Sequence, residues 1–122
     1  MNLLQQIKQN AKGLNKTIVL PEGVAERTLK AADIILQEEL AHIILLGNLD
    51  TIHNKAIQLG LSHVENAEII DPENHERREE MIQLIMDIRK SKGLTREDAE
   101  KLVNDPLYLG PLLIKAGYAD GE

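Results

Sequence analysis

Cysteine, tryptophan and phenylalanine are absent from this 122-residue sequence, and two tyrosines make up its aromatic content of 2%. Without cysteine the chain has neither a disulfide framework nor a thiolate zinc site. So few aromatic rings leave no stacking platform for single-stranded nucleic acid and require an aliphatic core. The formal net charge of −6 also argues against nucleic-acid binding, which needs a basic surface.

Long apolar runs and several well-known catalytic motifs are missing too. The apolar segments are far shorter than the ~20 residues of a membrane-spanning helix, and the polar, amphipathic start does not resemble a signal peptide. A cytoplasmic protein without a membrane span is expected. No Walker loop, G-x-G-x-x-G fingerprint or G-x-S-x-G elbow occurs. No metal site is predicted, because the histidines lack paired ligand spacing: His42, His53, His63 and His75.

Three short apolar runs are predicted to be β-strands: Thr17–Leu20, His42–Leu46 and Ala67–Ile70. They show no polar alternation, which is typical of strands buried on both faces. Apolar residues make up 43% of the chain and charged residues 28%, as in an ordinary soluble domain. The whole chain, 1–122, is interpreted as part of one domain.

Helical periodicity separates these runs. It predicts helices over about 3–12, 24–40, 48–59 and 72–92, a short helix from Thr95, and a last one from Asp105 to near Gly117. Asn48, Asp71 and Thr95 are predicted N-caps, with Pro72 at a first helical position and Asp98 completing a capping box with Thr95. Strands alternating with helices predict an α/β fold, a doubly wound and mainly parallel sheet.

Ligands of open parallel sheets bind beyond the carboxyl ends of the strands. Here these positions are Pro21-Glu22-Gly23 and Gly47-Asn48. Gly23 precedes a helix, where free backbone amides suit an anion. The alternative is a glycine that only the turn requires.

Two basic groups are candidate anion sites. Arg89, Lys90 and Lys92 lie close together near the end of a predicted helix, where compensation of the helix dipole and solubility are the alternative explanations. Arg27 and Lys30 occupy the first turns of another helix, where positive charge opposes the dipole. Arg27 therefore becomes a second candidate.

Four segments in order resemble the phosphate acetyl/butyryltransferase family. They are T-I-V-L-P-E-G at Thr17–Gly23 followed by R-T-L-K-A-A at Arg27–Ala32, R-K-S-K-G-L-T at Arg89–Thr95, D-P-L-Y-L-G at Asp105–Gly110, and A-D-G at Ala119–Gly121. The resemblance covers almost the whole chain. Two departures are Tyr118, where an acidic residue is common, and Pro111, which is expected to kink its helix.

The resemblance implies a three-layer fold like that of isocitrate and isopropylmalate dehydrogenases, incomplete in this chain. It also implies acetyl transfer between acetyl-CoA and inorganic phosphate to give acetyl phosphate, with coenzyme A (CoA) as substrate and no tightly bound cofactor. Arg89 and Arg27 match family arginines and become the candidate CoA-binding residues. The carboxylate base, serine and arginine that carry the family's chemistry match no position here, so no catalytic residue is assigned.

Because family members are much longer, the chain is expected to be an amino-terminal portion, one wall of a cleft, and inactive alone. Its sheet edge and apolar helix faces are expected to favour a homo-oligomer. Two alternatives stay open. One is a regulatory acetyl-CoA-binding module, as in malic enzyme fusions; the other is phosphate butyryltransferase.

Overall fold

The computed structural model describes residues 16–122 and contains one parallel sheet. The strands β1 (Thr17–Leu20), β2 (His42–Leu46) and β3 (Glu68–Ile70) lie in the order β1-β2-β3, with Ile18 opposite Ile43 and Leu45 opposite Ile69. The three predicted strands and their parallel arrangement are thus confirmed. The helix predicted at 3–12 lies outside the described residues.

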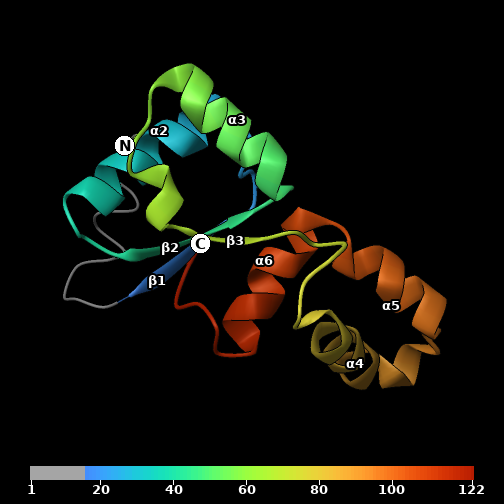
Figure 1. Cartoon of the computed structure of the whole chain (residues 1–122). Helices are drawn as coiled ribbons and strands as arrows, with labels where there is room; N and C mark the ends of the chain where they lie inside the picture. Colours follow the sequence, from blue (N-terminus) through green and yellow to red (C-terminus); the bar gives the residue numbers. More distant parts are fainter. Residues whose placement is uncertain (1–15) are drawn as a thin grey trace.

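Helices cover both faces of the sheet (Figure 1). On one face lie α2 (Glu26–Gln37) and α3 (Leu49–Leu59), and on the other α4 (Arg78–Ile88), α5 (Arg96–Val103) and α6 (Pro106–Lys115). Two 3₁₀ turns, η1 (Val64–Asn66) and η2 (Lys90–Lys92), complete the described elements. The architecture is three layers, α/β/α.

Alternate residues of β1 serve two separate cores. Ile18 and Leu20 pack in the cluster beneath α2 and α3, whereas Val19 packs in the cluster beneath α4, α5 and α6. Successive side chains of a strand point to opposite faces, so one short strand supports both layers. The largest fully buried side chains contain no aromatic ring, as predicted: Ile18, Leu29, Ile35, Leu45, Leu46, Ile52, Met81, Ile82, Ile85, Leu109 and Leu113.

The last residues return to the sheet beside β1. Gly121 forms a parallel bridge with Ile18, and the Val19 amide donates to the Gly121 carbonyl over 2.9 Å. Asp120 accepts from the Thr17 amide through its carboxylate at 2.8 Å, while its own amide donates to the Thr17 carbonyl at 2.7 Å. The A-D-G segment therefore occupies a fourth strand position next to β1.

Several predicted helix ends are confirmed. Asn48 caps α3 by accepting from the Thr51 amide at 3.0 Å. Gly60 ends α3 in the left-handed conformation, with φ 71°. Thr95 and Asp98 form the capping box of α5, each side chain accepting from the other residue's amide. Such local contacts satisfy the amides that the first helical turn leaves free.

The predicted start of α4 at Pro72 is wrong, because the helix begins at Arg78. Asp71 instead closes a local turn, in which its carboxylate accepts from the Glu73 amide at 3.0 Å and its carbonyl accepts from the Asn74 amide. Side-chain-to-backbone bonds of this kind compete with a helical start. The far end also differs, since α4 stops at Ile88 and η2 follows.

Pro111 lies inside α6, which continues as a helix from Pro106 to Lys115. Proline removes the amide that would bond the carbonyl four residues earlier. That carbonyl belongs to Leu107, which is 64% exposed in the first turn, so water can replace the missing donor. The proline is tolerated there without ending the helix.

Candidate functional site

A first hollow, the β1–β2 hollow, lies beyond the carboxyl ends of β1 and β2. It has a volume of ≈ 470 Å³ and is built from the two strand ends and the start of α6: Pro21, Glu22, Gly23, Val24, Ala25, Leu46, Gly47, Asp105, Pro106 and Leu107. This is where open parallel sheets bind ligands. Its charged side chains, Glu22 and Asp105, are both acidic, and Val24 and Leu107 on its rim are exposed apolar residues. The hollow therefore suits an apolar group better than a phosphate.

Gly23 forms the floor of the β1–β2 hollow and is required by packing. A β-carbon placed on Gly23 would lie 2.5 Å from the Leu46 carbonyl oxygen. The Gly23 amide donates to that same oxygen at 3.2 Å. This amide is already bonded and so is not free for an anion, and the close packing favours the turn explanation of Gly23.

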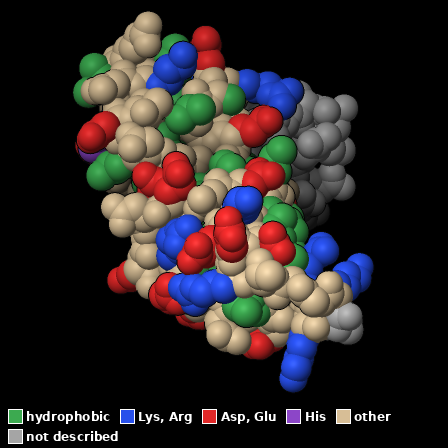
Figure 2. Space-filling model, turned by 90° about the vertical axis from the view of Figure 1, so that its right-hand side faces the viewer, with side chains coloured by type: hydrophobic (Ala, Val, Ile, Leu, Met, Phe, Trp, Pro, Cys, Tyr) green, Lys and Arg blue, Asp and Glu red, His purple; other side chains and the backbone are tan. Residues whose placement is uncertain are grey.

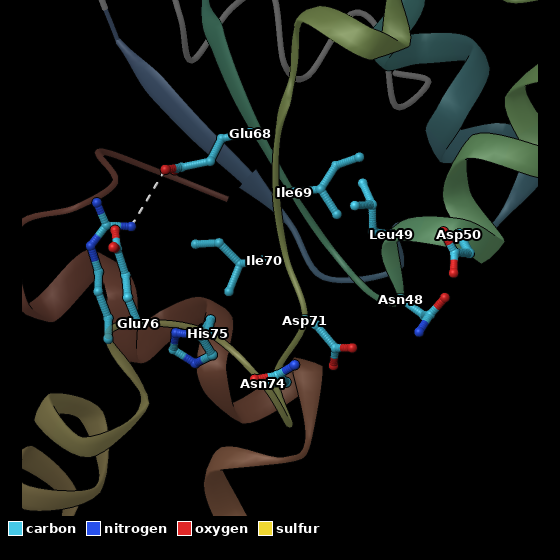
Figure 3. Close-up of a pocket in the computed structure, with 11 residues that line it drawn as sticks. Asn48, Leu49, Asp50, Glu68, Ile69, Ile70, Asp71, Asn74, His75 and Glu76 are labelled. Carbon is cyan, nitrogen blue, oxygen red and sulfur yellow. Dashed lines mark hydrogen bonds and ion pairs between the residues drawn. The ribbon is translucent and has the colours of Figure 1, made fainter.

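A second hollow, the β2–β3 hollow, lies next to the first and has a volume of ≈ 480 Å³. In the view of Figure 3, the end of β3 passes between Asn48, Leu49 and Asp50 on one side and Glu68, His75 and Glu76 on the other. Arg77 forms an ion pair with Glu68 at 3.5 Å. Carboxylates outnumber cations in this lining, so this hollow is not suited to an anion either.

His75 lines the β2–β3 hollow with both ring nitrogens buried and without a hydrogen-bond partner among residues 16–122. Burial lowers the pKa of His75, and the neighbouring Arg78 and Arg77 lower that pKa further. The imidazole is thus favoured in its neutral form. The structure describes no group of three or more acidic or histidine side chains able to hold a metal ion within residues 16–122.

Arg89 lies at the end of α4, as the residue after Ile88, and is partly exposed. Its Nε donates to the Tyr108 hydroxyl at 3.1 Å, and its guanidinium carbon lies 5.8 Å from the centre of the Tyr108 ring. Tyr108 belongs to the first turn of α6, next to the Asp105–Leu107 segment that lines the β1–β2 hollow. Arg89 therefore lies on a helix pair that reaches the carboxyl end of the sheet.

Arg27 occupies the first turn of α2 and is exposed. It makes no ion pair with residues 16–122, whereas Lys30 pairs with Glu26 at 2.8 Å. Since α2 and α4 cover opposite faces of the sheet, the structure does not bring Arg27 and Arg89 into contact. The role of both arginines in CoA binding stays a prediction.

The outer face of α4 and α5 carries charges of both signs (Figure 2). Arg96 pairs with Glu79 of α4 and with Glu100 of its own helix, and Lys101 lies 3.9 Å from Glu97. These pairs are exposed and contribute little stability. None of the described helices is long and apolar enough to cross a membrane.

Sequence reasoning missed two features of this region. Nothing in the spacing distinguished His75 from the other histidines, because its burial depends on a turn and a neighbouring helix. The Arg89–Tyr108 contact joins residues 19 positions apart on different helices, so helical periodicity does not reveal it. Arg89 and Tyr108 each lie in one of the four motifs, but the motifs do not show that the two side chains meet, and His75 lies in none of them.

The sequence profile of the family described as phosphate acetyl/butaryl transferase matches residues 2–122. The chain belongs to this family. Its match covers the amino-terminal part of the full-length members, so the resemblance of the four motifs is confirmed.

Curated relatives in the family carry the name phosphate acetyltransferase. That of Thermoanaerobacterium thermosaccharolyticum is 46% identical over 121 residues, covering 99% of this chain and 36% of the relative. That of Clostridium acetobutylicum is 42% identical with the same coverage. The chain thus spans about a third of the length of these family members.

Solved structures of the family share the fold. A phosphotransacetylase from Streptococcus pyogenes is 34% identical with a TM-score of 0.84, over 99% of this chain and 37% of that one. EutD phosphotransacetylase from Staphylococcus aureus is 33% identical with a TM-score of 0.82, over 98% and 37%. The three-layer chain is therefore a partial doubly wound α/β fold, as predicted.

Proposed function

We propose that this chain forms one wall of the cleft in an enzyme that transfers an acetyl group between acetyl-CoA and inorganic phosphate, giving acetyl phosphate and CoA. The match of residues 2–122 to the family carries this proposal. The names of the curated relatives favour the acetyl reaction over butyryl transfer and over a regulatory module. The proposal includes a cytoplasmic setting and no tightly bound cofactor.

Within this function we assign CoA binding to Arg89 and Arg27 and leave the bond-making chemistry to other parts of the enzyme. The linings of the two hollows contain no serine and no cation other than Arg77, which Glu68 already pairs. Stabilisation of developing negative charge needs donors aimed at the reacting atoms, and within residues 16–122 neither hollow supplies such a set. A polypeptide of residues 1–122 alone is expected to be inactive.

A chimera tests the function directly. In it, these 122 residues replace the matching segment of the phosphate acetyltransferase from Thermoanaerobacterium thermosaccharolyticum. We expect acetyl phosphate formation from acetyl-CoA and phosphate by the chimera, and none by the 122-residue polypeptide. A chimera that folds like its parent but forms no acetyl phosphate would contradict the proposal.

The same chimera tests the binding residues. Loss of a charged hydrogen bond to CoA costs about 1.5–3 kcal/mol, so Arg89→Gln is expected to raise the KM for CoA about tenfold or more. Lys101→Gln is the matched control, because Lys101 is a strongly exposed cation on the outer face of α5. An equal KM in both variants would remove Arg89 from the CoA site.

We also propose that the protein self-associates. Within residues 16–122, β3 pairs only with β2, so its outer edge offers free backbone groups. Ile57, on α3, is 77% exposed and adds apolar surface. Light scattering after gel filtration is expected to give a mass above that of one chain at high concentration; a uniform monomer would contradict this.

A further inference from the structure

We propose that Tyr108 is a positioning residue that holds the Arg89 guanidinium ready for an anionic group of the substrate. This inference rests on the function proposed above, in which Arg89 binds CoA. It adds to that site Tyr108, which belongs to a different helix from Arg89, and it explains what Tyr108 does there. The Arg89 contact with Tyr108 is the observation that leads to it.

The partner of Arg89 is neutral, as is the Asn104 side chain that Arg78 bonds at 3.0 Å, whereas two other arginines have carboxylate partners. Arg77 pairs with Glu68, and Arg96 pairs with Glu79 and Glu100. Arg89 meets no carboxylate among residues 16–122. Its positive charge is therefore not neutralised by the described part of the protein, and an incoming anion need not displace a carboxylate.

The geometry of the contact leaves the useful donors free. A guanidinium has five N–H donors, of which one is on Nε and four are on the two terminal nitrogens. The recorded bond of Arg89 uses Nε, at 3.1 Å from the Tyr108 hydroxyl. The two terminal nitrogens can bind a phosphate or carboxylate end-on, through two parallel hydrogen bonds. Tyr108 thus orients the guanidinium of Arg89 without occupying its two terminal nitrogens.

Both ends of the contact are held by the fold. The Arg89 amide donates to the Ile85 carbonyl at 3.0 Å, and its carbonyl accepts from the Lys92 amide at 3.0 Å. Tyr108 is partly buried and packs against the core beneath α4, α5 and α6. A free arginine side chain loses about 2 kcal/mol of rotamer entropy when it is fixed. Tyr108 lowers that loss at binding by restricting Arg89 beforehand.

Lys90 and Lys92 strengthen the positive potential at the same place. Both are exposed in η2, directly after Arg89, and neither forms an ion pair with residues 16–122. The occupant that this cluster fits is a group with more than one negative charge, such as a phosphate of CoA. The acidic β1–β2 hollow nearby does not compete for that group.

The second tyrosine of the chain supplies a matched control. Arg77 lies 4.3 Å above the Tyr118 ring, while the Tyr118 hydroxyl bonds Glu80 at 2.6 Å. Both tyrosines thus pack against an arginine at the edge of the same core, but Arg77 is already paired with Glu68. Tyr118→Phe therefore removes a hydroxyl without freeing or misplacing an available cation.

The experiment follows the Nε–H signals of the five arginines in the ¹⁵N-labelled 122-residue chain. Arg89→Lys identifies the Arg89 signal, and CoA is the added ligand. We expect CoA to shift the Arg89 signal in the wild-type chain. Tyr108→Phe is expected to weaken CoA binding about 3- to 10-fold, the range for loss of one hydrogen bond, and Tyr118→Phe less than twofold.

Each result decides a separate point. Equal CoA affinity and an unchanged Arg89 signal in Tyr108→Phe would overturn the positioning role while leaving the proposed function intact. A wild-type chain whose Arg89 signal ignores CoA would overturn Arg89 as a binding residue, and Tyr108 with it; the activity of the chimera then still decides the proposed function.

If the Tyr108→Phe variant does not fold, a measurement on the wild-type chain still tests the contact between Tyr108 and Arg89. Hydrogen bonding should slow exchange of the Arg89 Nε proton with water relative to that of the exposed Arg27. Equal exchange rates for the two protons would also overturn the proposal.

Discussion

His75 is a described side chain whose charged form is disfavoured in the folded protein. Its ring nitrogens are buried without a partner in residues 16–122. Burial is the main reason why the pKa of His75 is lowered from 6.5, and Arg78 and Arg77 add to the effect; Asp71 and Glu76 oppose it more weakly. Protonation would place a charge among these arginines, so the folded state prefers the neutral imidazole.

The pH dependence of stability follows from this preference. The unfolded chain binds a proton at His75 below about pH 6.5, whereas the folded chain does so only at lower pH. The contribution of His75 is therefore complete above pH 6.5 and is lost as the pH falls below it. Urea midpoints at pH 7.5 and 5.5 are expected to differ more in the wild-type chain than in His75→Gln. His53→Gln, at an exposed site, should keep the wild-type difference.

At the same scale, the sequence predicted some site residues and missed others. Arg89 could be selected because its cationic neighbours and its motif are contiguous in the chain. His75 and Tyr108 could not, since their importance comes from contacts with other elements. A histidine in a turn looks the same in sequence whether its ring is buried or exposed.

The junction between β1 and α2 shows how an element is fixed by backbone contact. Gly23 lies against the last residue of β2, and its amide bonds the Leu46 carbonyl. This single contact joins the loop after one strand to the end of the next. It also shapes the floor of the β1–β2 hollow.

Replacing this glycine should disturb the junction more than replacing a glycine in an open turn. Gly23→Ala places a β-carbon 2.5 Å from a backbone oxygen, and overpacking of this kind costs about 1–3 kcal/mol. Gly60→Ala is the control: its β-carbon meets nothing within 4 Å and costs about 1 kcal/mol through its left-handed conformation. Urea denaturation measures both. A loss in Gly23→Ala no larger than in Gly60→Ala would show that the loop can move away.

Element boundaries were predictable where the stabilising contact is local in sequence. The caps at Asn48 and Thr95 involve residues three positions apart, and both are confirmed. The start of α4 was not predictable, because an Asp-Pro pair such as Asp71-Pro72 can either cap a helix or close a turn. The structure shows the turn, and the sequence contains no signal that decides between them.

The architecture of the whole molecule was predictable because each layer leaves its own pattern. Buried parallel strands appear in the sequence as short apolar runs, and in the helices between them the apolar residues recur every three to four positions. The hollows were only partly predictable. The strand-end rule located Pro21–Gly23 and Gly47, but Asp105 and Pro106 join the same hollow from more than 50 positions away. Contacts across such separations depend on packing, which local pattern does not report.

The division of β1 between two clusters links the helical layers to each other. Removing Val19 from beneath α6 would also shift Ile18 and Leu20, which the same four-residue strand presents to α2. Neither layer can therefore loosen while the other keeps its full packing. Thermal unfolding of the described region should be a single cooperative event, shared by every helix that rests on this strand.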